Sequence, residues 1–476
     1  MIRRPKKDMR LHFVGIGGIG MSGIAEVFAN QGYQVSGSDQ AESDTTRRLA
    51  QLGISIQYKH SAENVSSAHV VVVSSAVKST NPELMEAKRL RIPVIRRAEM
   101  LAELMRGKTG IALAGTHGKT TTTSMLATIL VSAGLDPTLV IGGKVDSLGG
   151  NAKLGQGDLV VAEADESDGS FLHLPATYGV ITNIDNDHLD HFGNLAAIEE
   201  AFIEFVAKLP FYGVAVVCGD DPGVKRCLSR FTKPVLTYGL SEECDFFAQA
   251  IELRGMTTVF EFCARQSKAP GGGHPQCLGK VELSVPGRHN VLNALAVAVI
   301  ALQLGVPFEK IASGLKMFKG VKRRFEIRWQ DQQSKRVIID DYGHHPTEIA
   351  ATLSAARQFW SGKIRAIFQP HRYSRTLHCR DGFLSAFNVA DEVFLTDIYA
   401  AGEEPIDGVN SAALVEQIRA VSPSEKTVTY AGDLSAARDL MLKGFDSGML
   451  LICFGAGSIT RLPEQLIERL ESTKKS

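Results

Sequence analysis

The stretch TGIALAGTHGKT, residues 109–120, joins an apolar run to a glycine-containing loop that ends in lysine and threonine. Thr109–Ala114 predicts a buried strand, and Thr121–Ala133 predicts a helix. A glycine loop between a strand and a helix points backbone N–H groups and the positive end of the helix dipole at phosphate oxygens. The stretch therefore predicts a P-loop that holds the phosphates of ATP.

Two side chains of this loop suit a nucleoside triphosphate. Lys119 can neutralise charge on the β- and γ-phosphates, and the Thr120 hydroxyl can ligate Mg²⁺. The general P-loop pattern places a glycine five residues before Gly118, where this chain has Leu113. That departure weakens the match, whereas the strand–loop–helix context supports it. The residues of the loop expected to bind ATP are Ala114, Gly115, Thr116, His117, Gly118, Lys119 and Thr120.

Polar side chains follow two further apolar strands, Leu159–Ala162 and Gly179–Thr182. The first strand runs into four carboxylates between residues 163 and 168, and the second runs into Asn183 and His188. The carboxyl ends of parallel strands meet at one edge of a sheet, and Mg²⁺ prefers oxygen ligands. We expect Asn183 to meet the nucleotide and the acidic residues after Glu163 to face solvent. The predicted metal ligands are Thr120, Glu163 and His188; an acidic surface loop is the alternative.

Length and composition limit the class of protein. A chain of 476 residues suggests about three domains, and 44% hydrophobic with 22% charged residues is typical of a globular protein. The balance of 52 basic and 52 acidic residues argues against a nucleic-acid partner. No secretory signal and no apolar run of membrane-spanning length is present, so we expect a cytoplasmic protein without membrane insertion, as a monomer or weak homodimer.

The seven cysteines are odd in number and form no CxxC pair. This pattern predicts reduced, mostly buried thiols, with neither disulfides nor a zinc site. The glycine-rich run Pro270–Gly273 lies within Ser267–Gly279, which we expect to be a surface loop or a hairpin tip.

The first hundred residues alternate between strand and helix patterns, which predicts a doubly wound sheet. Gly15, Gly17 and Gly20 follow the first strand, and Asp39 closes the next one. This arrangement is typical of a dinucleotide site, so an NAD-dependent dehydrogenase is an alternative. The same strand–helix alternation returns after residue 320. We predict an N-terminal Rossmann-like domain (residues 1–107), a central P-loop ATPase-like domain (108–320) and a C-terminal Rossmann-like domain (321–476).

Taken together, these motifs resemble the Mur ligase family of peptidoglycan precursor enzymes, over nearly the whole chain. The resemblance implies an ATP-dependent ligase in which the lactyl carboxylate of UDP-N-acetylmuramate becomes an acyl phosphate. The amine of L-alanine then attacks it and phosphate leaves. Seven runs in the family's order make the resemblance specific: His12–Met21, Ala114–Thr123, Glu163–Phe171, Asn183–Asp190, Gly287–Asn290, Asp340–Pro346 and Gln369–Thr376.

The resemblance also implies roles for residues outside the P-loop. The UDP-sugar would be held by Gly15, Gly17, Gly18, Gly20, Asp39, Ser75 and Arg97. The amino acid would meet Tyr342, His344, Arg372 and Arg375, of which the two arginines would clamp its carboxylate. Further ATP contacts would come from Asn183, Asn290 with Asn293, Arg324, and Asp340 or Asp341. The catalytic residues would be Lys119, His188, Arg372 and Arg375.

Two points stay open within the family. Ligases for later steps carry a carbamylated lysine where this chain has Ile203, and Glu200 or Glu204 are candidates to replace it. The absent lysine favours the branch that adds L-alanine. A recycling ligase that attaches a preformed tripeptide shares the same nucleotide and UDP-sugar motifs, so it is the nearest alternative.

Overall fold

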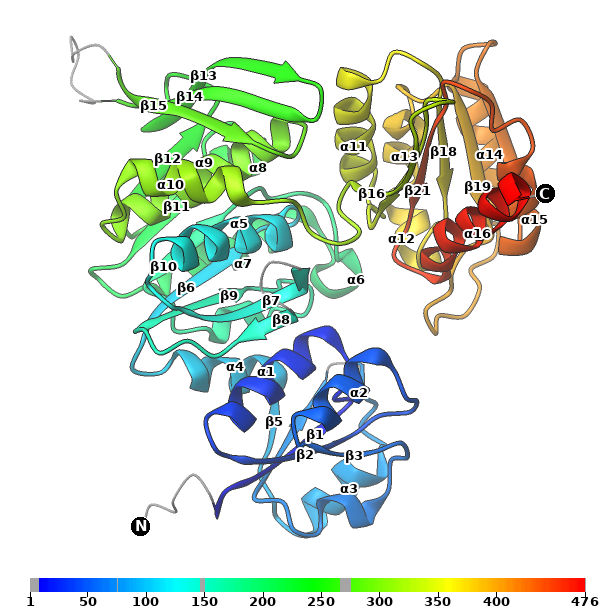
Figure 1. The fold of residues 1–476 in the computed structure, drawn as a ribbon. Helices are drawn as coiled ribbons and strands as arrows, with labels where there is room; N and C mark the ends of the chain where they lie inside the picture. The colour runs from blue at the N-terminus through cyan, green and yellow to red at the C-terminus, as the bar shows by residue number, and fades with distance from the viewer. Residues whose placement is uncertain (1–7, 75, 146–149, 266–274, 476) are drawn as a thin grey trace.

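The chain builds three separate sheets, each covered by helices (Figure 1). The computed structural model describes residues 8–74, 76–145, 150–265 and 275–475. We call the units around the three sheets the N-terminal, central and C-terminal domains. This arrangement confirms the predicted three-domain α/β fold. Among the described residues, no helix combines the length and the apolar character needed to cross a membrane.

The N-terminal domain is a five-stranded parallel sheet of order β3-β2-β1-β4-β5. Its first strand lies between β2 and β4, so the glycine loop that follows it opens at the centre of the sheet. Its elements are β1 Arg10–Val14, α1 Ile19–Asn30, β2 Gln34–Ser38, α2 Asp44–Gln51, β3 Ser55–Gln57, β4 Val70–Val73, α3 Pro82–Arg89, β5 Val94–Arg96 and α4 Arg97–Met105.

The central domain has a ten-stranded sheet of order β15-β14-β13-β12-β11-β10-β6-β9-β7-β8. The parallel strands β10, β6 and β9 lie side by side, which brings their carboxyl ends together. The first half comprises β6 Thr109–Ala114, α5 Lys119–Ser132, β7 Thr138–Val145, β8 Gly150–Lys153, β9 Leu159–Glu163, β10 Tyr178–Ile181, α6 Leu189–Phe192 and α7 Leu195–Ala207. The second half comprises β11 Val214–Cys218, α8 Pro222–Cys227, β12 Val235–Gly239, β13 Phe246–Arg254, β14 Thr257–Ala264, β15 Gln276–Leu283, α9 Arg288–Gln303 and α10 Phe308–Met317.

The C-terminal domain has a six-stranded sheet of order β16-β17-β21-β18-β19-β20, in which only the edge strand β16 is antiparallel to its neighbour. Its elements are β16 Glu326–Asp331, β17 Arg336–Asp341, α11 Pro346–Phe359, β18 Ile364–Phe368, α12 Tyr373–His378, α13 Arg380–Ala386, β19 Glu392–Thr396, α14 Ser411–Val421, β20 Thr427–Gly432, α15 Leu434–Leu442, β21 Leu450–Phe454 and α16 Leu462–Lys475.

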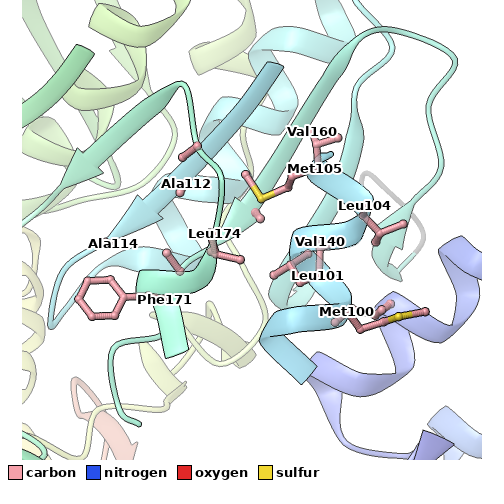
Figure 2. Packing of buried hydrophobic residues seen from close by; sticks show 14 of the residues in the cluster. Met100, Leu101, Leu104, Met105, Ala112, Ala114, Val140, Val160, Phe171 and Leu174 are labelled. Carbon is pink, nitrogen blue, oxygen red and sulfur yellow. The ribbon is translucent and has the colours of Figure 1, made fainter. Parts of the chain in front are cut away.

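Helix α4 joins the first two domains through apolar packing (Figure 2). It follows the last strand of the N-terminal sheet, yet Leu101, Leu104 and Met105 belong to the same buried cluster as Ala112 of β6 and Val160 of β9. One hydrophobic core therefore continues from the N-terminal domain into the central domain.

The structure corrects the expectation that the cysteines form no disulfide. Cys263 of β14 is bonded to Cys277 of β15. A register shift between the two antiparallel strands places their Cα atoms 3.9 Å apart. Spacing along the sequence could not show this, because a hairpin and its shift decide the pairing. The run Pro270–Gly273 lies outside the described residues, and Gln276–Gly279 belongs to β15 rather than to a loop.

Candidate active site

The P-loop lies between β6 and α5, where Gly118 caps the helix with a positive φ of 82°. The Lys119 ammonium folds back over the loop and donates to the carbonyl oxygens of Gly115 (2.7 Å) and Thr116 (3.1 Å). It also donates to Glu166 Oε1 at 2.8 Å. Burial alone would lower the pKa of Lys119, but Glu166 and Asp165 raise it, so the ammonium stays charged. A positive charge is thus fixed at the phosphate-binding turn.

Two of the three predicted metal ligands lie next to each other. The Thr120 hydroxyl donates to Glu163 Oε1 at 3.0 Å, and the Gly142 N–H donates to Glu163 Oε2 at 2.7 Å. Burial raises the pKa of Glu163 against the opposing effect of Lys119. A hydroxyl and a carboxylate oxygen are the ligand types that Mg²⁺ takes, so this pair fits the ion.

The third predicted ligand, His188, faces Glu166 instead of Glu163. Its Nε2 lies 3.5 Å from Glu166 Oε1. Glu166 is 1% exposed, so the expectation that the acidic residues after Glu163 face solvent is wrong for this one. The chain turns after β9 and directs the Glu166 side chain inward, between the lysine and the histidine. The sequence did mark Glu166 as a candidate, because it belongs to the same acidic run as Glu163. The strand pattern alone could not show that the Glu166 side chain points inward.

Asn183 holds the P-loop from the neighbouring strand end. Its side chain accepts the His117 N–H at 2.8 Å and donates to the His117 carbonyl at 3.0 Å. Both polar ends of the amide are therefore bonded to the loop backbone, while the residue also lines a cavity of about 1100 Å³. The structure thus gives Asn183 a positioning role in the loop beside its predicted contact with the nucleotide.

The same cavity lies between the central and C-terminal domains and is large enough for a nucleotide. Asn290 and Asn293 of α9 line it on one helical face, linked by a 3.3 Å hydrogen bond. Arg324 lines it from the C-terminal domain and donates to Glu348 Oε1 at 3.1 Å. The structure therefore brings together three residues predicted to contact ATP from different parts of the chain.

Of the two adjacent aspartates on β17, Asp341 lines this cavity. Asp340 points to the other face of the strand, because successive side chains alternate, and pairs with Arg323 at 3.3 Å. Burial raises the pKa of Asp340 to about 6. The geometry favours Asp341 over Asp340 as the residue near a ribose.

A second, small pocket gathers the predicted amino-acid arginines with the histidine. Arg372 and Arg375 line it together with Asp187 and His188. Arg375 Nε lies 3.2 Å from Asp187 Oδ1, across the junction between the central and C-terminal domains. Burial would raise the pKa of Asp187, but Arg375 lowers it, so the pair is ionised. Cationic groups from the C-terminal domain therefore face the phosphate-binding edge of the central domain.

Tyr342 and His344 lie nearby in an edge-on arrangement, with ring centroids 5.2 Å apart. The Arg324 guanidinium lies 5.0 Å from the centre of the Tyr342 ring. Burial lowers the pKa of His344 to about 3, so its imidazole is neutral at pH 7. A neutral imidazole beside arginines is compatible with an incoming amine, because it adds no further positive charge.

In the N-terminal domain, Asp39 is hydrogen-bonded to the backbone of the glycine loop. Asp39 Oδ2 accepts the Gly17 N–H at 2.8 Å. A Cβ at Gly17 would lie 2.8 Å from that oxygen, and one at Gly20 would lie 3.1 Å from Arg97 Cδ. The glycines therefore let Asp39 and Arg97 approach the loop closely. Ser75, another residue expected to bind the UDP-sugar, lies outside the described residues.

The candidates for replacing the carbamylated lysine do not reach this site. Glu200 lies 2.7 Å from Arg230 and Glu204 lies 2.8 Å from Lys208, with both carboxylates more than half exposed. These two residues form ion pairs on the surface of α7, so neither takes the place of the modified lysine.

Three domains that carry a glycine loop, a P-loop and a cationic pocket define a class of nucleotide-dependent ligases. The chain belongs to the Mur ligase family. Residues 10–109 match the model of the "Mur ligase family, catalytic domain", residues 113–301 the "Mur ligase middle domain" and residues 323–457 the "Mur ligase, glutamate ligase domain".

Full-length relatives show which members of the family it is similar to. It is 52% identical to a UDP-N-acetylmuramate--L-alanine ligase of Trichlorobacter lovleyi, over 97% of this chain and 99% of that protein. It is 50% identical to the ligase of the same name from Geobacter sulfurreducens, over 99% of both chains. The crystal structure of UDP-N-acetylmuramate-alanine ligase from Thermotoga maritima matches with a TM-score of 0.80 at 31% identity, over 98% of this chain and 100% of that one.

Proposed function

We propose that this protein joins L-alanine to the lactyl carboxylate of UDP-N-acetylmuramate, with ATP consumed through an acyl phosphate. The observation that carries this proposal is the 50–52% identity to ligases of that name over almost the entire chain. The site adds physical support, because the phosphate-binding turn, the acidic strand ends and the cationic pocket face one another. A cytoplasmic location and a monomeric or weakly dimeric state belong to the same proposal.

The side chains divide the reaction between two domains. Lys119 neutralises charge on the β- and γ-phosphates, so that the triphosphate and the sugar carboxylate, both anions, can approach each other. Thr120 and Glu163 would hold Mg²⁺, with His188 as a further candidate ligand, and the ion would offset charge on the transferring phosphoryl group. Arg372 and Arg375 orient the alanine carboxylate by charge-assisted hydrogen bonds.

The remaining predicted contacts hold ATP, the UDP part of the sugar nucleotide and the incoming amine. Asn290, Asn293, Arg324 and Asp341 hold ATP in the large cavity, and the N-terminal glycine loop holds the UDP pyrophosphate with Arg97 close to it. The neutral imidazole of His344 and the ring of Tyr342 receive the amine. Closing the C-terminal domain excludes water from the acyl phosphate, which would otherwise hydrolyse.

The deciding experiment measures ADP release with UDP-N-acetylmuramate and one of four acceptors: L-alanine, glycine, L-serine or the tripeptide L-alanyl-γ-D-glutamyl-meso-diaminopimelate. We expect the highest kcat/KM with L-alanine. Activity with the tripeptide alone would instead identify the recycling ligase. Failure to release ADP with every acceptor, together with NAD reduction, would identify the dehydrogenase alternative.

A P-loop variant tests the assigned chemistry. Lys119→Met is expected to lower kcat by at least about 100-fold, because one preorganised charge on the transferring phosphoryl group is lost. Lys88→Met, at an exposed position on α3, is the matched control and should keep full activity. Full ligation by Lys119→Met would disprove the proposed mechanism.

A further inference from the structure

Three side chains that could ligate a metal ion meet where the P-loop faces the C-terminal domain. They are His117 of the P-loop, Asp185 after β10 and His345 at the start of α11. One ligand atom from each lies within 4.8 Å of the others. His117 Nε2 is 2.9 Å and His345 Nδ1 is 3.7 Å from the same oxygen, Asp185 Oδ2.

These separations are close to what a tetrahedral metal ion needs. Zn²⁺ binds imidazole nitrogen and carboxylate oxygen at about 2.0–2.1 Å, which places neighbouring ligand atoms roughly 3.3 Å apart. The two imidazole rings lie with their centroids 4.6 Å apart and their planes 36° from each other, so they converge on Asp185 from adjacent positions. Changes in side-chain torsion angles would have to bring ligand atoms that now lie up to 4.8 Å apart to a separation of about 3.3 Å.

The outer nitrogen of each ring already has the partner that a metal-binding histidine uses. His345 Nε2 lies 3.3 Å from the Asn186 carbonyl oxygen, and His117 Nδ1 lies 3.7 Å from Glu348 Oε1. A carbonyl or carboxylate on the far nitrogen fixes the ring orientation and makes the inner nitrogen a better ligand. The cluster therefore has both an inner ligand set and an outer shell.

The contacts now made by the inner atoms are compatible with an ion. The Thr347 hydroxyl donates to Asp185 Oδ2 at 2.7 Å, and a carboxylate oxygen has a second lone pair for a metal. The Thr347 N–H donates to His345 Nδ1 at 3.3 Å, a long bond that caps α11. The metal would replace this long bond and the 2.9 Å hydrogen bond between His117 Nε2 and Asp185 Oδ2.

We propose that His117, Asp185 and His345 bind one divalent transition-metal ion of the Zn²⁺ class, at a site separate from the Mg²⁺ ligands Thr120 and Glu163. Two imidazoles and one carboxylate are the ligands of a three-coordinate protein site with an open fourth position. Since His345 comes from the C-terminal domain and the other two ligands come from the central domain, the bound ion favours the orientation in which the two domains meet.

Equilibrium dialysis of the chelator-treated full chain against Zn²⁺, without nucleotide, measures the site directly. We expect one ion per chain and a Kd that rises at least about 100-fold in His345→Asn, since even outer-shell changes cost 10–100-fold. Asparagine is a good helix N-cap, so this variant keeps the start of α11. His173→Asn removes an exposed histidine outside the cluster and should leave the Kd unchanged.

Unchanged affinity in His345→Asn, or no bound Zn²⁺ in the native chain, would overturn the proposal. Co²⁺ provides a second measurement on the native chain that needs no variant. We expect the intense visible absorption of a tetrahedral site, and the weak absorption of octahedral Co²⁺ would overturn the proposal as well. Neither measurement uses ligase activity, so the outcome does not depend on the proposed function.

Discussion

The two junctions between domains differ in chemistry. At the first, α4 buries Leu101, Leu104 and Met105 against strands of the central sheet, within one continuous hydrophobic cluster (Figure 2). At the second, the contacts are ionic and polar: Arg375 with Asp187, and Thr347 with Asp185. The central domain is thus joined to its neighbours by two different kinds of force.

The difference indicates which domain moves. Separating the two sides of an apolar junction exposes hydrocarbon surface to water, which costs about 25 cal/mol of free energy per Å². Apolar side chains form no hydrogen bonds with water that would offset this cost. Parting a polar junction replaces protein hydrogen bonds with water hydrogen bonds, so the net cost is small. We infer that the N-terminal and central domains move as one body and that the C-terminal domain opens and closes over the ATP cavity.

Introducing a charge into the apolar junction should cause the largest change, a loss of stability. Leu101 is 1% exposed within the hydrophobic cluster, and Leu101→Asp places a carboxylate among apolar side chains. We expect the free energy of unfolding to fall by about 4 kcal/mol or more, measured by urea denaturation. Leu101→Met nearly conserves volume and should cost less than about 1.5 kcal/mol. A small loss in Leu101→Asp would mean that water already reaches this junction.

Removing the cation of the polar junction should affect activity more than stability. We expect Arg375→Met to lower kcat/KM for L-alanine by about 100-fold or more, because the carboxylate clamp and the contact with Asp187 are both lost. The free energy of unfolding should change by less than about 1 kcal/mol, because the domains separate and water reaches Asp187.

Arg380→Met, at an exposed position on α13, is the control for this variant and should be neutral in both assays. A stability loss of 3–5 kcal/mol in Arg375→Met, as for a charge left buried, would show that the second junction stays closed. The two junctions would then be equally rigid, and the inferred motion of the C-terminal domain would be wrong.

The contrast between the junctions also marks the limit of sequence analysis. The strands and their polar ends follow from local patterns, so the P-loop, Glu163 and the three sheets were predictable. Contacts between distant segments were not. Glu348 meets His117 only because α11 faces the P-loop across the junction between two domains. The packing of α4 against β6, and the Cys263–Cys277 bond, likewise depend on tertiary contacts and strand register that no local pattern specifies.

Removing a single hydrogen bond across the polar junction should lower activity by a smaller factor. Thr347 donates to Asp185 from the C-terminal side at 2.7 Å. Thr347→Ala is expected to lower kcat/KM by about 2- to 10-fold, the equivalent of 0.5–1.5 kcal/mol for one hydrogen bond. Thr347→Ser keeps the hydroxyl and should retain most of the activity. Equal losses in both variants would assign the effect to the methyl group instead of the hydrogen bond.

The smallest effect is expected where an ion pair lies beside the apolar junction. Arg97, at the start of α4, lies 3.4 Å from Asp165 of the central domain, and the Asp165 side chain is 43% exposed. Ion pairs of this kind contribute about 0–1 kcal/mol, so Arg97→Met should leave the urea midpoint almost unchanged. The contrary result would be that the N-terminal and central domains of Arg97→Met unfold in two separate transitions. In that case the ion pair, and not the buried leucines of α4, would join the two domains. The contrast between the two junctions would then disappear.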